Sequence, residues 1–456
     1  MSELIAVILA AGKGTRMRSK LPKVLHKVGG KEMLQHVIDA ATVAGADEKV
    51  VIIGHGAELV EKMVGDQGKI ALQAEQLGTG HAVMQTKEAL AGFTGTAMIL
   101  CGDTPLLDGE ELKKFYAGHK ESGAAATVLT AVMENPYGYG RIVRDEAGNV
   151  LGIVEEKDAT AEQKLIKEIN TGIYCIECPL MFDVLATLTC NNAQGEYYLT
   201  DVLSKLNERG EKVGGVVTED SDMVMGINSR KQLAVAEGVM RNRILDKLMD
   251  AGVTIMDPAS TFIEDSVKIG ADTIIYPYTW LEGATEIGED CEVGPNVRLT
   301  NVKVGNDTHM QFVYGHDCEV GNGVTVGPYV HLRPDTVISD KVKIGNFVEV
   351  KNSNVGVGTK LPHLTYIGDS DIGSGVNMGC GCITVNYDGK KKHRTIVEDN
   401  VFVGCNTNLV APVTVKQGSY IGAGSTITKE VPENALGIAR AKQKNYEGWA
   451  EKQRQS

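Results

Sequence analysis

The sequence predicts an α/β doubly wound domain followed by a prism-shaped solenoid of hexapeptide repeats, and three observations lead to this prediction. The chain has 456 residues, enough for two or three domains. Over roughly the first half, short apolar runs alternate with helical patterns. Beyond Pro258, aliphatic residues recur at every sixth position.

Three continuous apolar runs, at 4–11, 49–55 and 97–103, fit strands that are buried on both faces of a parallel sheet. A helical pattern over 31–45 separates the first two and stops at Gly45, and this alternation is typical of a doubly wound domain. The apolar residues expected on one face of that helix are Met33, Leu34, Val37, Ile38 and Ala41.

A second helical pattern over 231–251 contains no proline and one glycine, and we expect it to link the domains. The predicted division is therefore a first domain over 1–228, a linker helix over 229–251 and a repeat domain with its C-terminal tail over 252–456.

The repeat region has a period of six, which matches neither a helix nor a simple strand. Its first aliphatic series is Ile263, Ile269, Ile275, Leu281, Ile287, Val293 and Leu299. The frame then slips and resumes at Val320 and again at Val397. Three hexapeptide sides per coil give about eighteen residues per turn, with each aliphatic side chain pointing inward. Flat outer faces of such a prism commonly pack against copies of the same chain, so we expect an oligomer.

The composition of the chain argues against some classes of function. The formal net charge of −13 argues against nucleic-acid binding as the main task. No run approaches the roughly 18 apolar residues of a membrane span, so we expect no membrane insertion. The 9 cysteines are scattered and odd in number, which favours free thiols in a reducing cytoplasm. Cys175 and Cys178 have the spacing of a metal or redox pair, a minor alternative.

The stretch LAAGKGTRM at 9–17 has the composition of a phosphate-binding loop. Gly12 and Gly14 leave backbone N–H groups open where a strand ends and a helix is expected to begin, and Arg16 and Lys23 add cations. The stretch matches neither the P-loop nor the dinucleotide fingerprint. Asp103 ends a predicted strand, where a carboxylate can hold Mg²⁺ against nucleotide phosphates. The alternative for the glycine-rich stretch is a plain surface turn, and the alternative for Asp103 is an aspartate that caps a turn.

Eight further motifs extend the pattern: LPKVL, QAEQLGTGHA, GD, YGYGRI, VEEKDA, INTGIY, NNAQGEYYLTD and the hexapeptide half. With the glycine-rich loop, they resemble the bacterial family of bifunctional N-acetylglucosamine-1-phosphate uridylyltransferases and glucosamine-1-phosphate N-acetyltransferases. The resemblance covers both halves and implies a left-handed parallel β-helix for the second. It implies acetylation of glucosamine 1-phosphate by acetyl-CoA, then uridylyl transfer from UTP to give a cell-wall precursor.

For uridylyl transfer, the resemblance implies that Arg16 and Lys23 neutralise phosphates and that Asp103 and Asn228 hold Mg²⁺. Transfer to the α-phosphorus needs alignment and charge neutralisation more than covalent help. The implied nucleotide-binding residues are Leu9, Ala10, Ala11, Gly12, Lys23, Gln73, Gly78, Thr79, Gly102 and Asp103. The implied sugar-binding residues of this half are Gly140, Glu155, Asn170 and Asn228.

In the repeat half, His363 interrupts the hexapeptide frame. Residues about eighteen apart should stack, which would gather several polar side chains near it: Arg333, Lys351, Tyr366, Asn377 and Asn386. Arginine and lysine suit a sugar phosphate. From the residues alone, a structural histidine is the competing interpretation.

By resemblance, His363 is the general base that deprotonates the glucosamine amine, with backbone oxyanion donors near Cys380 and Glu349 as a candidate to orient the ring. Arg333, Lys351, Tyr366 and Asn377 would bind the sugar phosphate. The implied acetyl-CoA residues are Cys380, Asn386, Tyr387, Cys405, Ala423 and Arg440. The basic run 390–394 is either a solvated loop or a contact for coenzyme A phosphates from a neighbouring subunit. The family implies a homotrimer.

Four positions depart from the family. Cys101 replaces the usual tyrosine, which places the contact expected at that position in question. Cys380 and Cys405 replace alanine and serine, and Pro362 precedes the predicted base. These three departures place substrate preference and thiol sensitivity of the acetyl site in question. A monofunctional nucleotidylyltransferase with a structural β-helix is the alternative function, and a non-enzymatic scaffold is a poorer third.

Overall fold

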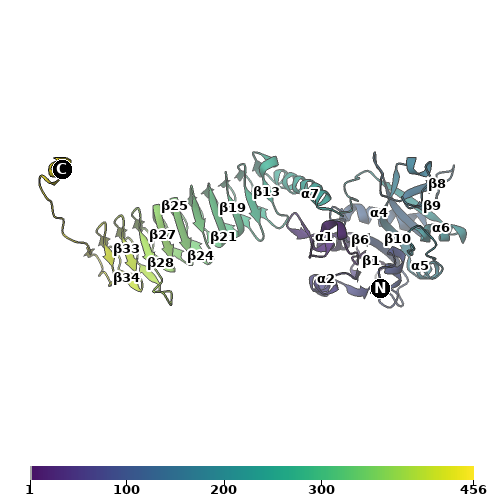
Figure 1. Cartoon of the computed structure of the whole chain (residues 1–456), viewed down its shortest axis with the longest axis horizontal. Coiled ribbons are helices and arrows are strands. Elements are labelled where there is room, and N and C mark those ends of the chain that lie inside the picture. Colours follow the sequence, from purple (N-terminus) through teal and green to yellow (C-terminus); the bar gives the residue numbers. More distant parts are fainter. Residues whose placement is uncertain (1–2, 456) are drawn as a thin grey trace. The chain divides into compact units, whose positions relative to one another are not determined.

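The computed structural model describes residues 3–455 and divides the chain into two compact units, the first ending at Met240 and the second beginning at Arg241. The division falls inside helix α7 (Arg230–Asp250), which corresponds to the helix predicted over 231–251 (Figure 1). No helix among residues 3–455 is both long and apolar enough to cross a bilayer.

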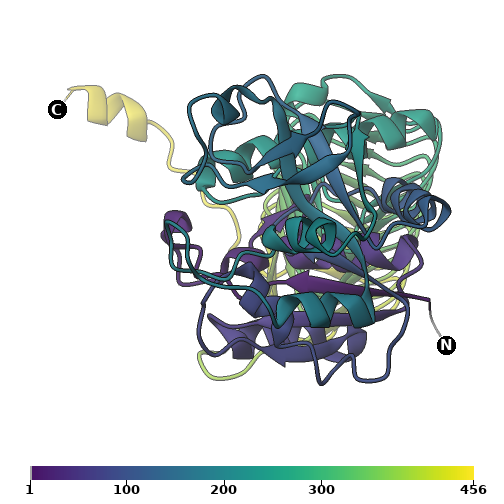
Figure 2. The ribbon, with the colours of Figure 1, turned by 90° about the vertical axis from the view of Figure 1, so that its right-hand side faces the viewer.

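The first unit, which faces the viewer in Figure 2, is built on a mixed sheet. Its strand order is β11-β7-β10-β6-β1-β4-β5. Strand β10 runs antiparallel to both of its neighbours, and the other adjacent pairs are parallel. The hairpin β8–β9 extends from β10. The strand bounds are β1 (Leu4–Leu9), β4 (Glu48–Ile53), β5 (Lys69–Leu72), β6 (Thr96–Cys101), β7 (Ala126–Val132), β8 (Arg141–Arg144), β9 (Val150–Val154), β10 (Glu168–Glu177) and β11 (Val213–Thr218), with a separate short pair β2 (Lys27–Val28) and β3 (Lys31–Glu32).

Helices cover both faces of this sheet, which confirms the doubly wound prediction. Alternate residues of β1 enter two different hydrophobic clusters: Ile8 packs with Leu34 of α1 and Phe115 of α4, whereas Val7 packs with Met181 and Leu203 on the other side. The helix bounds are α1 (Met33–Val43), α2 (Ala57–Val64), α3 (Thr79–Met84), α4 (Gly109–Ser122), α5 (Cys178–Leu185) and α6 (Asp201–Glu208), with 3-10 turns at Thr15–Met17, Lys23–Leu25, Gly65–Gln67 and Gln163–Leu165.

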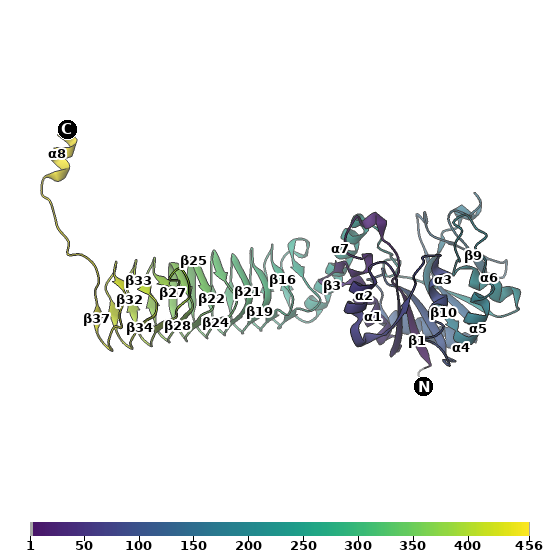
Figure 3. The ribbon, with the colours of Figure 1, turned by 60° about the horizontal axis from the view of Figure 1, so that its bottom comes forward.

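The second unit is a left-handed parallel β-helix, whose coils are seen side by side in Figure 3. The aliphatic series of the sequence points inward: Ile263 stacks on Leu281 and Leu281 on Leu299, all at most 4% exposed. Asparagine and aspartate occupy many corners in the left-handed conformation, as at Asp290 and Asn406, because these residues tolerate a positive φ.

The coils differ in length, which explains why the hexapeptide frame slips. Phe262 pairs with Trp280, eighteen residues on, whereas Arg298 pairs with Tyr314, sixteen residues on. The strand bounds are β12 (Thr254–Ile255), β13 (Phe262–Ile263), β14 (Lys268–Ile269), β15 (Ile274–Ile275), β16 (Trp280–Glu282), β17 (Glu286–Ile287), β18 (Glu292–Val293), β19 (Arg298–Val304), β20 (His309–Met310), β21 (Val313–Val320), β22 (Thr325–Val326), β23 (Val330–Leu332), β24 (Thr336–Ile338), β25 (Lys343–Lys351), β26 (Asn354–Val355), β27 (Lys360–Gly368), β28 (Ser370–Ile372), β29 (Asn377–Met378), β30 (Ile383–Val385), β31 (Thr395–Val397), β32 (Phe402–Val403), β33 (Asn408–Val410), β34 (Val413–Val415), β35 (Tyr420–Ile421), β36 (Thr426–Ile427) and β37 (Leu436–Gly437), with a 3-10 turn at Pro258–Ser260 and a C-terminal helix α8 (Trp449–Gln455).

Candidate active sites

A cavity of about 310 Å³ opens at the carboxyl ends of β1 and β6 in the first unit. It gathers nine of the ten predicted nucleotide-binding residues; the exception, Gly102, instead donates its N–H to Leu9 O and closes β6 against β1. Sequence reasoning missed Val24, Gln76, Ala82 and Glu196, which also line the cavity. The predicted residues along its wall are Leu9, Ala10, Ala11, Gly12, Lys23, Gln73, Gly78, Thr79 and Asp103.

The glycine-rich loop does not lead into an α-helix, contrary to expectation. Only the 3-10 turn Thr15–Met17 follows it, after Gly14 in the left-handed conformation. A Cβ on Gly14 would lie 2.6 Å from the Lys23 Cβ, so this glycine allows Lys23 to approach the loop. A Cβ on Gly12 would meet nothing within 4 Å, so that backbone is open to a ligand. Arg16 is exposed and lies outside the cavity lining.

Lys23, Asp103 and Asn228 form a compact polar group beside this loop. The Lys23 ammonium donates to the Asp103 carboxylate and, at 2.9 Å, to Asn228 Oδ1. The Ile227 N–H donates to Asp103 O, which fixes the two chain segments together. The side-chain oxygen atoms of Asp103 and Asn228 therefore already contact a cation, the Lys23 ammonium. A carboxylate and an amide oxygen fit Mg²⁺, which keeps several waters and substrate phosphates as its other ligands. Within residues 3–455 no group of three or more His, Cys, Asp or Glu side chains could hold a metal.

On the far wall, Gln73 is buried and its amide donates to Gly78 O at 3.1 Å. Gly78 has φ +105, and a Cβ there would lie 2.6 Å from Tyr197 O. Thr79 Oγ1 accepts from the Leu199 N–H at 3.1 Å. These contacts fix the positions of Gln73, Gly78 and Thr79 in the cavity wall.

The predicted sugar residues Gly140, Glu155 and Asn170 are neighbours in space. Glycine is needed at 140 because a Cβ would lie 2.9 Å from the Ile153 methyl group and 3.5 Å from both Asn170 and Glu155. Asn170 Oδ1 accepts from the Tyr174 hydroxyl at 2.9 Å. Burial raises the pKa of Glu155, so its carboxyl holds a proton more readily than an exposed glutamate.

Cys101 also lines the cavity. Its thiol donates weakly to Gly172 O at 3.7 Å, and a Cβ on Gly172 would lie 2.9 Å from the sulfur. Burial raises the pKa of Cys101 to about 12, so the thiol stays neutral. Cys175 and Cys178 are buried free thiols, which favours the interpretation as free cysteines over a metal or redox pair.

In the second unit, His363 stacks on Asn346 of the preceding coil (Asn346↔His363). The two side chains meet at 2.7 Å, His363 Nδ1 to Asn346 Oδ1. An amide oxygen only accepts, so Nδ1 carries the proton and Nε2 keeps its lone pair. The expectation that Glu349 orients the ring is wrong, because Glu349 stacks on Tyr366 and binds Arg333 at 2.8 Å instead.

Two of the cations expected near His363 lie side by side. Leu332 pairs with Val350, which places Arg333 beside Lys351, and Lys351 lies 3.6 Å from Asp369. The next coil is one residue shorter than the expected eighteen, since Lys351 pairs with Gly368 and not with Asp369. Asp369 accepts from the amides of Asn352 and Asn386, and Asn386 also donates to the Tyr366 hydroxyl at 3.3 Å.

Sequence reasoning missed Lys392 as an individual residue, although the basic run 390–394 was its signal. The adjacent Lys351 lowers the pKa of Lys392, since two ammonium groups side by side repel. Other members of the run are engaged locally: Arg394 binds Asp371 and His393 binds Asp388. An anion between Lys351 and Lys392 would relieve their repulsion.

Cys380, Cys405 and Ala423 occupy equivalent positions on three successive coils, because Met378 pairs with Val403 and Val403 with Ile421. Arg440 donates to Ala423 O at 2.7 Å. Asn377 lies in β29 and pairs with Lys360 and Phe402. Tyr387 is exposed and forms an isolated bridge with Lys392.

The position of Cys405 has a consequence for Cys380. At other corners an Asn or Asp side chain in this position accepts from the N–H one coil earlier, as Asn306 does from Glu289 and Asp340 from Asn322. Cys405 offers no such oxygen, and the Cys380 N–H has no hydrogen-bond partner within the described residues. The Gly381 N–H reaches His363 O at 3.4 Å, so this free donor lies one coil from the histidine.

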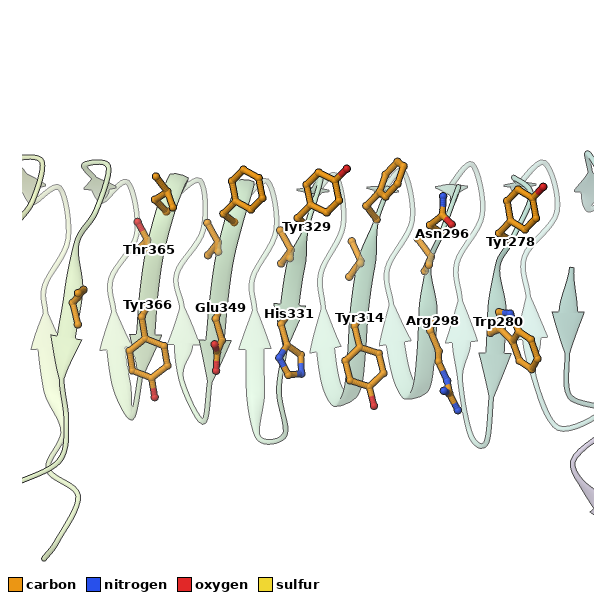
Figure 4. A pocket seen from close by; sticks show the side chains of 18 residues that line it. Tyr278, Trp280, Asn296, Arg298, Tyr314, Tyr329, His331, Glu349, Thr365 and Tyr366 are labelled. Carbon is orange, nitrogen blue, oxygen red and sulfur yellow. The ribbon is translucent and has the colours of Figure 1, made fainter. Parts of the chain in front are cut away.

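One side of the β-helix carries a shallow cavity of about 720 Å³ lined by rings (Figure 4). At one corner, bulky side chains adopt the left-handed conformation that Asn and Asp adopt elsewhere: Tyr278, Phe312, Tyr329, Phe347 and Leu364, which we call the corner ridge. Tyr278, Tyr329 and Phe347 are 62%, 56% and 54% exposed. Backbone strain and exposed apolar groups are both frequent at functional surfaces. In the sequence, the signal for this surface is a large side chain at a corner position where other coils carry Asn or Asp.

The fold and these sites define a two-site transferase, with a nucleotide-type cavity on an α/β sheet and a histidine-centred site on a β-helix. A family profile described as nucleotidyl transferase matches residues 5–253, and one described as bacterial transferase hexapeptide (six repeats) matches 317–352 and 394–429.

Relatives match this chain over nearly its whole length. The "Bifunctional protein GlmU" of Caldanaerobacter subterraneus subsp. tengcongensis is 54% identical, and that of Geobacillus sp. (strain WCH70) is 52% identical, each over 99% of this chain and 98% of the relative. The protein of the same name from Clostridioides difficile is 51% identical over the same shares of both chains. The chain belongs to the GlmU family of bifunctional proteins.

Proposed function

We propose that this protein acetylates glucosamine 1-phosphate with acetyl-CoA on the β-helix and then transfers uridylyl from UTP to the product in the first unit, releasing pyrophosphate. The observation that carries the proposal is His363 with its Nδ1 held by Asn346, next to the unpaired Cys380 N–H, in a chain that also holds a complete nucleotide-type cavity. A purely structural β-helix has no need of this arrangement.

For acetyl transfer, His363 Nε2 takes a proton from the sugar amine as the amine nitrogen attacks the thioester carbonyl carbon. The Cys380 N–H donates to the oxygen that becomes negative. The C–S bond then breaks, the thiolate of coenzyme A leaves, and the imidazolium returns its proton. Arg333, Lys351 and Lys392 neutralise the sugar phosphate. Tyr366 and Asn377 line the sugar, and Asn386, Tyr387, Cys405, Ala423 and Arg440 line the path of acetyl-CoA.

For uridylyl transfer, a phosphate oxygen of the acetylated sugar attacks the α-phosphorus of UTP, in line with the leaving pyrophosphate. Gln73, Gly78 and Thr79 hold the base, and the open backbone at Gly12 lets the phosphates approach. Bound between Asp103 and Asn228, Mg²⁺ would supply charge neutralisation. The Lys23 ammonium, which otherwise bridges these two side chains, then turns to the phosphates together with Arg16.

The product sugar phosphate would be held by Gly140, Glu155 and Asn170. Because Gly140 has no side chain, its backbone lies close to the other two residues, as the contacts of a Cβ there indicate. The amide of Asn170 and the carboxyl of Glu155 offer hydrogen bonds to sugar hydroxyl and acetamido groups.

The active form is proposed to be a homotrimer that packs through the corner ridge. Leu364, one member of the ridge, directly follows His363, so a neighbouring copy on the ridge would also cover the acetyl site. The nine cysteines are all free thiols, which supports a reducing cytoplasmic location. The proposed ligands are small molecules, without nucleic acid or membrane insertion.

The decisive experiment is a coupled assay with glucosamine 1-phosphate, acetyl-CoA, UTP and Mg²⁺ that follows UDP-N-acetylglucosamine. His363→Ala should abolish acetyl transfer and leave uridylyl transfer intact, whereas Asp103→Ala should do the reverse. His309→Ala, a substitution of an exposed solenoid histidine outside the site, should change neither rate. Intact uridylyl transfer without acetyl transfer in the unmodified protein would instead establish the monofunctional alternative.

A further inference from the structure

Two cysteines of the β-helix lie directly above one another. Met378 pairs with Val403, so Cys380 and Cys405 follow at the same position of successive coils, and the Asn406 N–H donates to Cys380 O at 2.7 Å. Neighbouring strands of a sheet are about 4.8 Å apart. That spacing lies inside the range of roughly 4.4–6.8 Å between Cα atoms that a disulfide can bridge.

These two thiols differ from the other cysteines of the β-helix in their access to solvent. Cys405 is exposed and Cys380 is half-buried, whereas Cys291, Cys318 and Cys382 are buried. The Cys382 thiol points to Gly404 O at 3.3 Å, within the packed interior. A soluble oxidant can therefore reach Cys380 and Cys405 and is kept from their buried neighbours.

We propose that Cys380 and Cys405 form a thiol–disulfide modification site whose reaction partner is a low-molecular-weight disulfide. One cysteine thiolate attacks a sulfur of the small disulfide, forms a mixed disulfide and releases one small thiol. The second cysteine then attacks the protein sulfur of the mixed disulfide and releases the other small thiol. Two electrons pass from the dithiol to the small disulfide, and two protons leave the cysteines with them.

The bridge would silence acetyl transfer, a consequence that rests on the proposed function. A Cys380–Cys405 bond turns both side chains toward each other and shifts the local backbone at the point where the Cys380 N–H is free, one coil from His363. A displacement of about 1 Å in a reacting geometry can cost about 100-fold in rate. The nucleotide cavity belongs to the other compact unit, so uridylyl transfer should not change.

The test exposes the reduced full-length protein to oxidised glutathione and reads mass and activity in parallel. We expect unreduced peptide mapping to join the peptides of Cys380 and Cys405, with the joined pair lighter by two hydrogen atoms than the two reduced peptides. Acetyl transfer should fall about 100-fold and return with dithiothreitol, while uridylyl transfer stays constant.

Two variants test whether the two cysteines react as a pair or as single thiols. The activity of each oxidised variant is compared with that of the same variant in its reduced form. In Cys405→Ser and Cys380→Ala, glutathione should remain attached to the remaining cysteine, because no second thiol expels it. Cys190→Ser, which removes an exposed cysteine of the first unit, should respond as the unmodified protein does.

Stable glutathione adducts without a cross-link in the unmodified protein would overturn the proposal, as would a cross-link that leaves acetyl transfer unaffected. A reduced protein without any acetyl transfer would refute the proposed function instead, since the cross-link is detected by mass alone.

Discussion

At the scale of single residues, one hydrogen bond decides the chemistry of the β-helix site. His363 can act as a base at Nε2 because Asn346 accepts from Nδ1. Asn346 touches no reacting atom in the proposed mechanism and acts as a positioning residue. Its effect should therefore be visible in the rate and pH dependence of acetyl transfer more than in substrate affinity.

Asn346→Leu removes the acceptor, so the ring loses its fixed tautomer and orientation. We expect kcat for acetyl transfer to fall roughly 10–100-fold with little change in KM. In Asn346→Asp the new carboxylate favours the protonated ring, so the acidic limb of the pH–rate profile should move to higher pH.

Steady-state kinetics across pH, with uridylyl transfer as an internal reference, provide the measurement. Asn354→Leu, which replaces an asparagine one strand away that binds Asp371, is the matched control and should retain the original profile. An unshifted profile in Asn346→Asp would contradict the positioning role.

At the scale of elements, the close stacking of coils fixes the site more firmly than any single contact. Strands β25 and β27 pair over most of their length, from Lys343↔Lys360 to Lys351↔Gly368. This long ladder holds Asn346 under His363 and Glu349 under Tyr366. Because each coil is hydrogen-bonded to the next, a side chain that separates two coils should weaken the whole ladder.

Gly345→Ala tests this stacking, since a Cβ at 345 would lie 1.9 Å from Pro362 O. The backbone oxygen cannot move without breaking the ladder, so we expect a loss of about 2–3 kcal/mol in the free energy of unfolding. Gly238→Ala, in helix α7 with nothing within 4 Å of the new Cβ, should instead stabilise by about 1 kcal/mol. Urea unfolding monitored by circular dichroism compares the two; equal effects would refute the steric argument.

At the scale of the whole molecule, the corner ridge is an apolar surface that stays exposed to water in an isolated chain. The rings of Tyr329 and Phe347 stack with their centroids 5.2 Å apart, yet both are more than half exposed. Residues of this size in the left-handed conformation cost about 1–3 kcal/mol each. Burial between copies would offset that cost, and this reasoning supports the proposed trimer.

Tyr329→Glu places a charge on the ridge, which opposes its burial. We expect light scattering to show dissociation from trimer to monomer, with loss of acetyl transfer and retention of uridylyl transfer. Val337→Glu introduces the same charge at an exposed apolar residue (40% exposed) that lies outside the ridge cavity, and it should leave the assembly intact. A Tyr329→Glu protein that remains trimeric would exclude the ridge as the interface.

Sequence reasoning was most successful where the signal is local. The apolar runs at 4–11, 49–55 and 97–103 became β1, β4 and β6, because burial on both faces requires uninterrupted apolar side chains. The period of six predicted the β-helix because each inward aliphatic residue repeats the same local geometry. Nine of the ten nucleotide-binding residues implied by the resemblance line one cavity, since these residues cluster in short segments.

The sequence by itself therefore determined two architectures and the residue types that carry their chemistry. Tertiary structure alone decided the partners: Asn346 rather than Glu349 beside His363, Lys392 beside Lys351, and Cys405 above Cys380. Stacked partners lie sixteen residues apart at Arg298 and Tyr314 but twenty-five apart at Asn377 and Phe402. A change of one residue in coil length moves every later side chain to a new neighbour, so spacing in the sequence cannot supply the register.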